Sequence, residues 1–322
     1  MFQKALKIIT TVLLFLVTVN VYGGNGHETT ITCKVHNNTG SAVVLYKIEN
    51  GEAIDLGFRR PGEIDTCMFS FPMEKEAVYF LRKAGPHMPA YNFVIYLKPG
   101  DNKLVDIYAS KMGLDFDSCN VQNPNHETVI LQSWTNFFNA VAKLGTNRAK
   151  RDDYIIAYNN LVKQAEKLKR QTVSNNRYFK NLLASKLDAD LQYARAAAFF
   201  HFGERMNSGL DSAAIHQQFY QPMAKQKFCS ASVLQSEHGL TLLKYNLGYQ
   251  LFQKYETQEQ MLATSFVDKM KMICNDTVRA IFALDRMQQI TNYEVFKTDI
   301  QPFKKLFATI ALSRPTSKKK MS

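Results

Sequence analysis

The chain of 322 residues lacks the short motifs that mark the commonest catalytic and nucleotide-binding sites. It contains no H-E-x-x-H, no G-x-S-x-G, no P-loop and no G-x-G-x-x-G. The sequence therefore gives no motif that indicates a metalloprotease, a hydrolase with a nucleophile elbow or a nucleotide-binding protein. The five cysteines lie far apart and form no C-x-x-C that could alternate between dithiol and disulfide. We therefore predict no catalytic, cofactor-binding or metal-binding residue in this chain, and we expect no cofactor.

Glycine and proline are also scarce, with 15 and 9 residues, whereas hydrophobic residues make up 46% and aromatic residues 12% of the chain. This composition excludes collagen-like and low-complexity proteins and indicates a packed chain of one large domain or two ordinary ones. The formal net charge of +12 suggests an anionic partner. No helix-turn-helix, zinc-finger or RNA-binding signature is present, so we expect no nucleic acid among the partners.

The N-terminus has an apolar run that is too short for a membrane-spanning helix. Lys4 and Lys7 precede the uncharged apolar residues 8–19, and short side chains follow at Val21 and Gly23. This order is typical of a secretory signal peptide, whereas a spanning helix needs about 20 apolar residues. We predict a signal peptide at 1–23, cleavage near Gly23, and export to the periplasm or cell envelope.

The cysteines number five, and an odd count leaves at least one unpaired within a monomer. Cys33 alternates with Ile31, and Cys67 alternates with Phe69, so both cysteines are expected to point into a sheet core. Two interpretations follow. Cys33 and Cys67 form a disulfide, or they are small buried hydrophobic residues, which is the usual environment of free cysteine.

The first third of the mature chain has the pattern of a β-rich domain, predicted at residues 24–124. Short alternating runs are separated by turn residues such as Asn50-Gly51 and Pro99-Gly100, which favours an antiparallel sandwich or barrel-like domain. Asn123-Pro124 then marks the domain boundary. The predicted strands cover residues 30–35, 43–48, 53–58, 66–71, 77–81, 91–97 and 104–108.

After residue 124 the apolar residues recur at three- and four-residue steps, which predicts an all-helical domain at 125–312. The fold class is therefore α+β, with a basic disordered tail at 313–322. The apolar stripe of Trp134, Phe137, Phe138 and Val141 is expected to be core. The predicted helices cover residues 127–144, 155–168, 176–201, 212–220, 239–255, 258–273, 277–290 and 294–311.

The segment from Lys143 to Lys186 holds eleven basic and three acidic residues, which makes it the most basic part of the chain. Lys163, Lys167 and Arg170 fall on one side of a predicted helix. They are candidates for a face that binds an anionic partner such as a membrane surface or an acidic protein. The alternative is that they form the solvated side of an amphipathic helix.

Four segments share features with one known family. Residues 91–108, YNFVIYLKPGDNKLVDIY, place a Leu-x-Pro-Gly-Asp turn between two alternating strands. The others are FDSCNVQNPNHETVILQSW from Phe116, SNNRYFKNLLASKLDADLQYARAAAFF from Ser174, and NDTVRAIFALDRMQQITNYEVF from Asn275, where Asn-Asp-Thr opens a helix. Over residues 28–312 the chain resembles the N-terminal region that precedes the thioredoxin domain in exported bacterial TlpA/ResA-like thiol-disulfide oxidoreductases.

The resemblance implies a part in thiol–disulfide chemistry, with one departure. In the family a thioredoxin domain with C-x-x-C follows the helical region, whereas here the sequence runs into a lysine-rich end, so no redox cysteine can be carried over. We therefore expect a noncatalytic exported accessory or binding module, with a thioredoxin-domain protein or another envelope protein as partner. The alternatives are the front half of an interrupted oxidoreductase, and an enzyme with an unrecognised site between the two domains.

Overall fold

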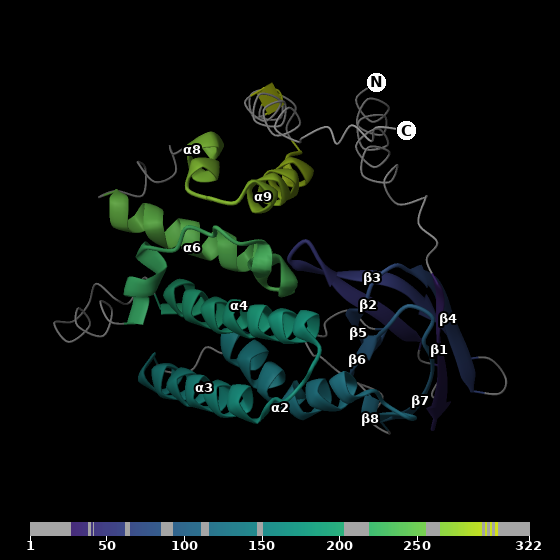
Figure 1. The fold of residues 1–322 in the computed structure, drawn as a ribbon. Coiled ribbons are helices and arrows are strands. Elements are labelled where there is room, and N and C mark those ends of the chain that lie inside the picture. The colour runs from purple at the N-terminus through teal and green to yellow at the C-terminus, as the bar shows by residue number, and fades with distance from the viewer. Residues whose placement is uncertain are drawn as a thin grey trace, which may run out of the picture. The chain divides into compact units, whose positions relative to one another are not determined.

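The computed structural model describes residues 27–37, 40, 42–61, 65–84, 93–110, 116–146, 151–202, 219–255, 265–291, 294, 297, 300 and 301. The predicted signal peptide and basic tail lie outside the described residues, as do most of the helices predicted at 212–220 and 294–311. Eight described strands precede the described helices, so the chain has the predicted α+β class (Figure 1).

The chain divides into two compact units. The first comprises the described residues of Met1–Leu45, Gly57–Ala84 and Asn92–Thr128. The second comprises the described residues of Tyr46–Leu56 and Val129–Ser322. The tip of one β-hairpin therefore belongs with the helices, which sequence periodicity does not reveal.

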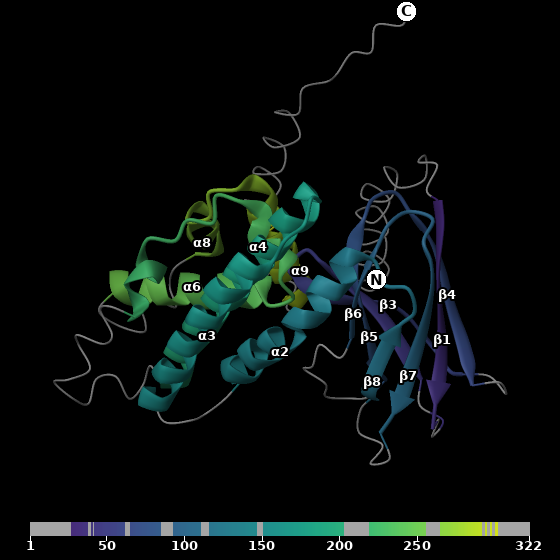
Figure 2. The same ribbon diagram turned by 60° about the horizontal axis from the view of Figure 1, so that its bottom comes forward.

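The strands form two four-stranded sheets (Figure 2). The first has the order β4-β1-β7-β8 and consists of β4 (Thr66–Met73), β1 (His27–His36), β7 (Asn102–Ala109) and β8 (Phe116–Val121). The second has the order β3-β2-β5-β6 and consists of β3 (Glu52–Arg59), β2 (Val43–Glu49), β5 (Ala77–Lys83) and β6 (Phe93–Leu97). Strand β1 pairs antiparallel with β4 but parallel with β7, so the first sheet is mixed rather than purely antiparallel.

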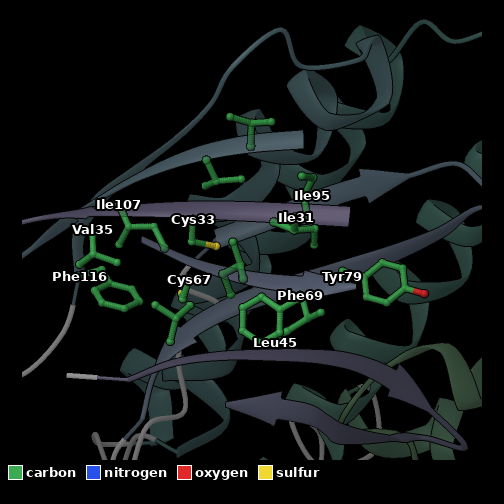
Figure 3. Packing of buried hydrophobic residues seen from close by; sticks show 14 of the residues in the cluster. Ile31, Cys33, Val35, Leu45, Cys67, Phe69, Tyr79, Ile95, Ile107 and Phe116 are labelled. Carbon is green, nitrogen blue, oxygen red and sulfur yellow. The ribbon is translucent and has the colours of Figure 1, made fainter. Parts of the chain in front are cut away.

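Inward-pointing side chains from both sheets share one core, which makes the first unit a β-sandwich (Figure 3). Alternate residues of β1, Ile31, Cys33 and Val35, are almost fully buried, as the period of two along a strand requires. Leu45 and Ile95 contribute from the other sheet. Burying each large apolar side chain stabilises the fold by about 1.5–3 kcal/mol.

Strand β6 differs from the half-buried strand that its alternation predicts. Val94 and Tyr96 are buried as well as Ile95 and Leu97, so the strand is covered on both faces. The backbone N–H of Tyr96 donates to Oγ1 of Thr128 (3.0 Å). This bond ties the first turn of the following helix to the sheet.

The described helices of the second unit are α2 (His126–Thr146, whose first turn belongs to the first unit), α3 (Arg151–Gln171), α4 (Arg177–Phe202), the 3-10 turn η2 (Ala231–Gln235), α6 (Gly239–Lys254), α8 (Phe266–Lys271) and α9 (Asp276–Gln289). Helix α4 packs against both α3 and α6 (Figure 1). The stripe of Trp134, Phe137, Phe138 and Val141 on α2 is buried, as predicted. Among the described helices none combines the length and apolar character needed to cross a bilayer.

The turn between β2 and β3 lies against the residues that lead into α6. Gly51 has a left-handed φ of +83°, and a Cβ there would lie 3.0 Å from the backbone nitrogen of Leu240. The N–H of Gly51 donates to the carbonyl of Leu234 (3.0 Å), and its carbonyl accepts from Leu240 (3.3 Å). Only glycine fits this close approach without strain, and it fixes the position of the segment between η2 and α6.

Candidate functional site

A disulfide between Cys229 and Cys274 joins the segment before η2 to the turn between α8 and α9. Both cysteines are exposed. Backbone bonds flank the disulfide, because Cys274 N–H donates to the carbonyl of Lys227 (2.8 Å) and Asn275 N–H donates to that of Phe228 (3.1 Å). The sequence analysis missed this pair, and since 45 residues separate the two cysteines, no local spacing signals it.

An open cavity of about 330 Å³ lies beside Cys229, between α4 and the segment that carries the disulfide. A smaller cavity of about 90 Å³ continues it, because Gln192 and Gln226 line both. We call the two cavities together the α4 groove. Its lining consists of Ser185, Asp188, Ala189, Gln192, Arg195, Pro222, Met223, Gln226, Phe228, Cys229, Ser230, Ser232, Val233 and Asn246.

A separate cavity of about 310 Å³ is lined by Cys274, the other half of the disulfide. Lys225, Lys227 and Lys271 surround it, and we call it the lysine cavity. Lys271 also forms an ion pair with Asp268 (2.8 Å). Cys229 and Cys274 therefore lie in different electrostatic surroundings, and the positive charge is concentrated around Cys274.

A left-handed backbone conformation at Phe228 and the side chain of Arg279 fix the walls of these cavities. Phe228 is buried and has a φ of +49°, a left-handed conformation that costs a bulky residue about 1–3 kcal/mol. On the other side, the guanidinium of Arg279 donates to the carbonyls of Ile273 (2.7 Å) and Met270 (3.2 Å). Both halves of the disulfide are thus fixed by contacts other than the S–S bond.

A buried ionic cluster links α4 to the residues before α6. The Nζ atom of Lys186 lies 2.8 Å from Asp190 Oδ2 and 2.9 Å from Glu237 Oε2. The hydroxyl of Ser236 donates to Asp190 Oδ1 (2.5 Å). The ring of His238 stacks on Tyr193, with centroids 4.1 Å apart.

Burial governs the protonation of this cluster. It raises the pKa of Glu237 to about 8 and lowers the pKa of His238 to about 4. It also lowers the pKa of Lys186, although Asp190 opposes the shift. Since one ammonium group faces two carboxyl groups, its charge is best compensated when Glu237 holds a proton.

The cluster is closed to ligands. Only 3% of the Lys186 side chain and 2% of the Asp190 side chain are exposed, and neither residue lines the α4 groove or the lysine cavity. Shifted pKa values also occur in structural ion-pair networks. We therefore assign a structural role to the cluster. It fixes α4 relative to η2 and α6, and α4 forms the floor of the α4 groove.

The three predicted basic residues, Lys163, Lys167 and Arg170, lie on the exposed side of α3. Within the described part of the chain none of them forms an ion pair, whereas the neighbouring Lys169 pairs with Glu166 (3.2 Å). Their placement fits both interpretations of the sequence, a docking face and a solvated helix side. They do not line the α4 groove.

Cys33 and Cys67 lie directly opposite each other on β1 and β4, inside the sandwich (Figure 3). Both are free thiols, so the structure does not contain the disulfide that was one of the two alternatives. The thiol of Cys33 is hydrogen-bonded to Cys67, which raises the pKa of Cys33 and lowers that of Cys67. Burial raises the pKa of the third free thiol, Cys119, and all three act as small apolar residues.

Metal-ligating groups and similar known proteins are two further sources of information about function. Among the residues described by the structure, no three histidine, cysteine or acidic side chains are grouped to hold a metal ion. No protein-family model, curated protein or solved structure matches the chain. The resemblance to TlpA/ResA-like proteins therefore stays a prediction from the sequence.

Proposed function

We propose that the protein is a noncatalytic, exported binding module that works with a thiol–disulfide oxidoreductase of the TlpA/ResA-like kind, and that the α4 groove is its binding site. Two arguments support the proposal. The sequence resemblance implies a thiol–disulfide system, and the groove is an accessible hollow in the helical region, which in the resembled family precedes the thioredoxin domain in the sequence.

The observation that carries the proposal is the chemistry of the groove lining. Gln192 and Gln226 each supply an amide that donates and accepts hydrogen bonds, and Ser230 and Ser232 add hydroxyl groups. Asp188 is the acid and Arg195 the base of the lining. Among the described residues that line the groove there is no histidine beside the serines, so the lining suits recognition of polar backbone groups better than nucleophilic catalysis.

The partner that fits this lining is an exposed polypeptide segment of a thioredoxin-domain protein. Peptide groups present alternating donors and acceptors, which side-chain amides and hydroxyls can match. The floor of the groove is rigid, because the buried ionic cluster holds α4. A rigid groove binds a segment without the cost of ordering its own walls.

Site-specific photo-cross-linking in the producing cells tests the proposal. A photoreactive phenylalanine analogue replaces Ser232 in the groove, and in a matched control it replaces Lys180, an exposed residue of α4 that lies outside the groove. Products are identified by mass spectrometry of the envelope fraction. We expect a thioredoxin-domain protein to be cross-linked from position 232 and not from position 180.

Two results would contradict the proposal. One is the absence of any thioredoxin-domain protein among the products from position 232 while the variant is folded and exported. The other is an identical set of products from positions 232 and 180, which would mean that the groove has no special part in binding. A third variant, Gln192→Arg, should reduce the specific product by filling the groove with a bulky charged side chain.

A further inference from the structure

The Cys229–Cys274 disulfide lies where a partner seated in the α4 groove would meet it. We propose that this disulfide is a site of thiol–disulfide exchange, at which a dithiol protein docked in the α4 groove attacks Cys229 and displaces Cys274. The inference rests on the proposed function and names the bond on which the partner acts. It requires that the disulfide be accessible, polarised and able to break without unfolding the chain.

Accessibility separates this pair from the other cysteines. Cys229 and Cys274 are exposed, whereas Cys33 and Cys67 are buried and Cys119 is partly buried. Disulfides that only support a fold resist reduction, and exposed disulfides are the labile ones. Each half of the bond also lines a cavity large enough to admit a side chain of another protein.

The two cavities give the bond a direction. A thiolate attacks one sulfur of a disulfide and expels the other, and the better leaving group is the one whose thiolate is more stable. Cys274 lines the lysine cavity, where Lys225, Lys227 and Lys271 would stabilise its thiolate. Cys229 lines the groove near Asp188, which offers no such stabilisation. Attack from the groove on the sulfur of Cys229 therefore leaves the negative charge on the favourable side.

The exchange balances with a dithiol protein as the reductant. Its first thiolate forms a bond to the Cys229 sulfur while the S–S bond breaks and the electron pair stays on the Cys274 sulfur, which then takes a proton. The second thiol of the partner then loses its proton, and its thiolate attacks the partner's first sulfur in the mixed disulfide. This step releases Cys229 as a thiolate, which takes up a proton. The chain gains two electrons and two protons, and the partner's dithiol becomes a disulfide.

The surrounding backbone keeps the two cysteines in place after the bond breaks. The hydrogen bonds from Cys274 to Lys227 and from Asn275 to Phe228 hold the two segments together independently of the sulfur atoms. Arg279 holds the carbonyls of the turn that precedes Cys274. The reduced thiols thus stay close enough to be oxidised again, so the exchange can be reversible.

The test uses the full exported chain with its disulfide intact and a purified thioredoxin as probe. A thioredoxin whose second active-site cysteine is replaced by serine traps the mixed disulfide, and peptide mapping by mass spectrometry locates it. We expect the trapped bond at Cys229. With unaltered reduced thioredoxin, we expect the triple substitution Lys225→Gln, Lys227→Gln and Lys271→Gln to slow reduction about fivefold.

The matched control is the triple substitution Lys143→Gln, Arg177→Gln and Lys180→Gln, which removes the same charge at exposed residues that line neither the α4 groove nor the lysine cavity. It should leave the reduction rate within about twofold of the unaltered chain. Trapping at Cys274, equal slowing by both triple substitutions, or unfolding of the reduced chain by circular dichroism would overturn the proposal. So would failure of thioredoxin to reduce a bond that a phosphine reductant opens in the folded chain.

Failure of this inference can be told from failure of the proposed function. The variant Cys229→Ala/Cys274→Ala removes the bond but keeps the groove. If the photo-cross-link from position 232 to a thioredoxin-domain protein persists in that variant while no exchange occurs in the unaltered chain, the binding function stands and the exchange is wrong.

Discussion

Lys186 and Asp190 form an ion pair of 2.8 Å one turn apart on α4, with 3% and 2% of their side chains exposed. Glu237 approaches the same ammonium group at 2.9 Å. The pair stands on the helix that forms the floor of the α4 groove, so the position of that floor depends on how these three groups compensate one another. Their energetics can be measured directly.

Removing one partner of the pair should cost more than removing both. Lys186→Met leaves Asp190 buried and unpaired, and we expect it to lower the free energy of unfolding by about 3–4 kcal/mol. The double variant Lys186→Met/Asp190→Leu should lose less than Lys186→Met alone, because no buried charge is stranded. Urea unfolding measures both.

The control is Lys169→Met, whose pairs with Glu166 and Asp188 are at the surface and should contribute less than about 1 kcal/mol each. The single variant Asp190→Leu completes the cycle. A double variant that loses the sum of the losses of Lys186→Met and Asp190→Leu would show that the buried charges do not interact.

Glu237 should make the protein less stable as the pH rises. Its pKa is about 8 in the folded chain, against an ordinary value of 4.5, so the folded state holds a proton that the unfolded state has lost. The free energy of unfolding therefore falls between about pH 4.5 and pH 8. Glu237→Gln cannot ionise, and its stability relative to the unaltered chain should increase over that range by about 1–3 kcal/mol. Glu166→Gln is the exposed control, and a constant difference between Glu237→Gln and the unaltered chain would contradict the shift.

His238 should have the opposite effect on the acid side. Its pKa is lowered from 6.5 to about 4 by burial, so the unfolded chain binds the extra proton and stability falls as the pH drops from about 6.5 to about 4. His238→Phe keeps a ring on Tyr193 and should flatten this loss. An NMR titration of the imidazole checks the cause, with the exposed His27 as reference, and protonation of His238 near pH 6.5 would refute the shift.

Retention on vesicles distinguishes the two interpretations of the basic side of α3, a docking face for anionic partners and the solvated side of an amphipathic helix. Replacing Lys163, Lys167 and Arg170 by Glu should change the free energy of unfolding by less than about 0.5 kcal/mol, because all three are exposed. The same variant should be retained severalfold less on vesicles containing anionic lipid at physiological salt. If the unaltered chain is not retained on such vesicles, the residues form the solvated side of an amphipathic helix.

The regular parts of the fold could be predicted because burial repeats with the period of the element. The alternation through Cys33 and the stripe through Trp134 both mark core faces, and both are buried. Strand β8 could not be found this way, since only Phe116 and Val121 of its six residues are buried and its place depends on pairing with β7. The helix predicted at 277–290 begins one residue earlier, at Asp276, and the side chain of Asn275 caps it.

The candidate site could not be predicted from local sequence patterns, for a different reason. Its parts come from segments that meet only in the folded chain, as the disulfide between Cys229 and Cys274 shows. Asp188 and Asp190 lie two residues apart on α4, but only Asp188 is exposed, because Asp190 pairs with Lys186 inside the protein. A signal existed in the sequence: Lys186 and Asp190 lie four residues apart on the same stripe as Leu183 and Leu187.

The rate at which reduced thioredoxin opens Cys229–Cys274, compared between the unaltered chain and Gln192→Arg/Ser232→Arg, tests most directly whether the α4 groove receives a thiol–disulfide partner. A small phosphine reductant serves as the reference because it needs no docking. We expect the double substitution to slow thioredoxin about tenfold while leaving the phosphine rate unchanged. Equal rates for thioredoxin on both chains, or equal slowing of both reductants, would contradict a docking role for the groove.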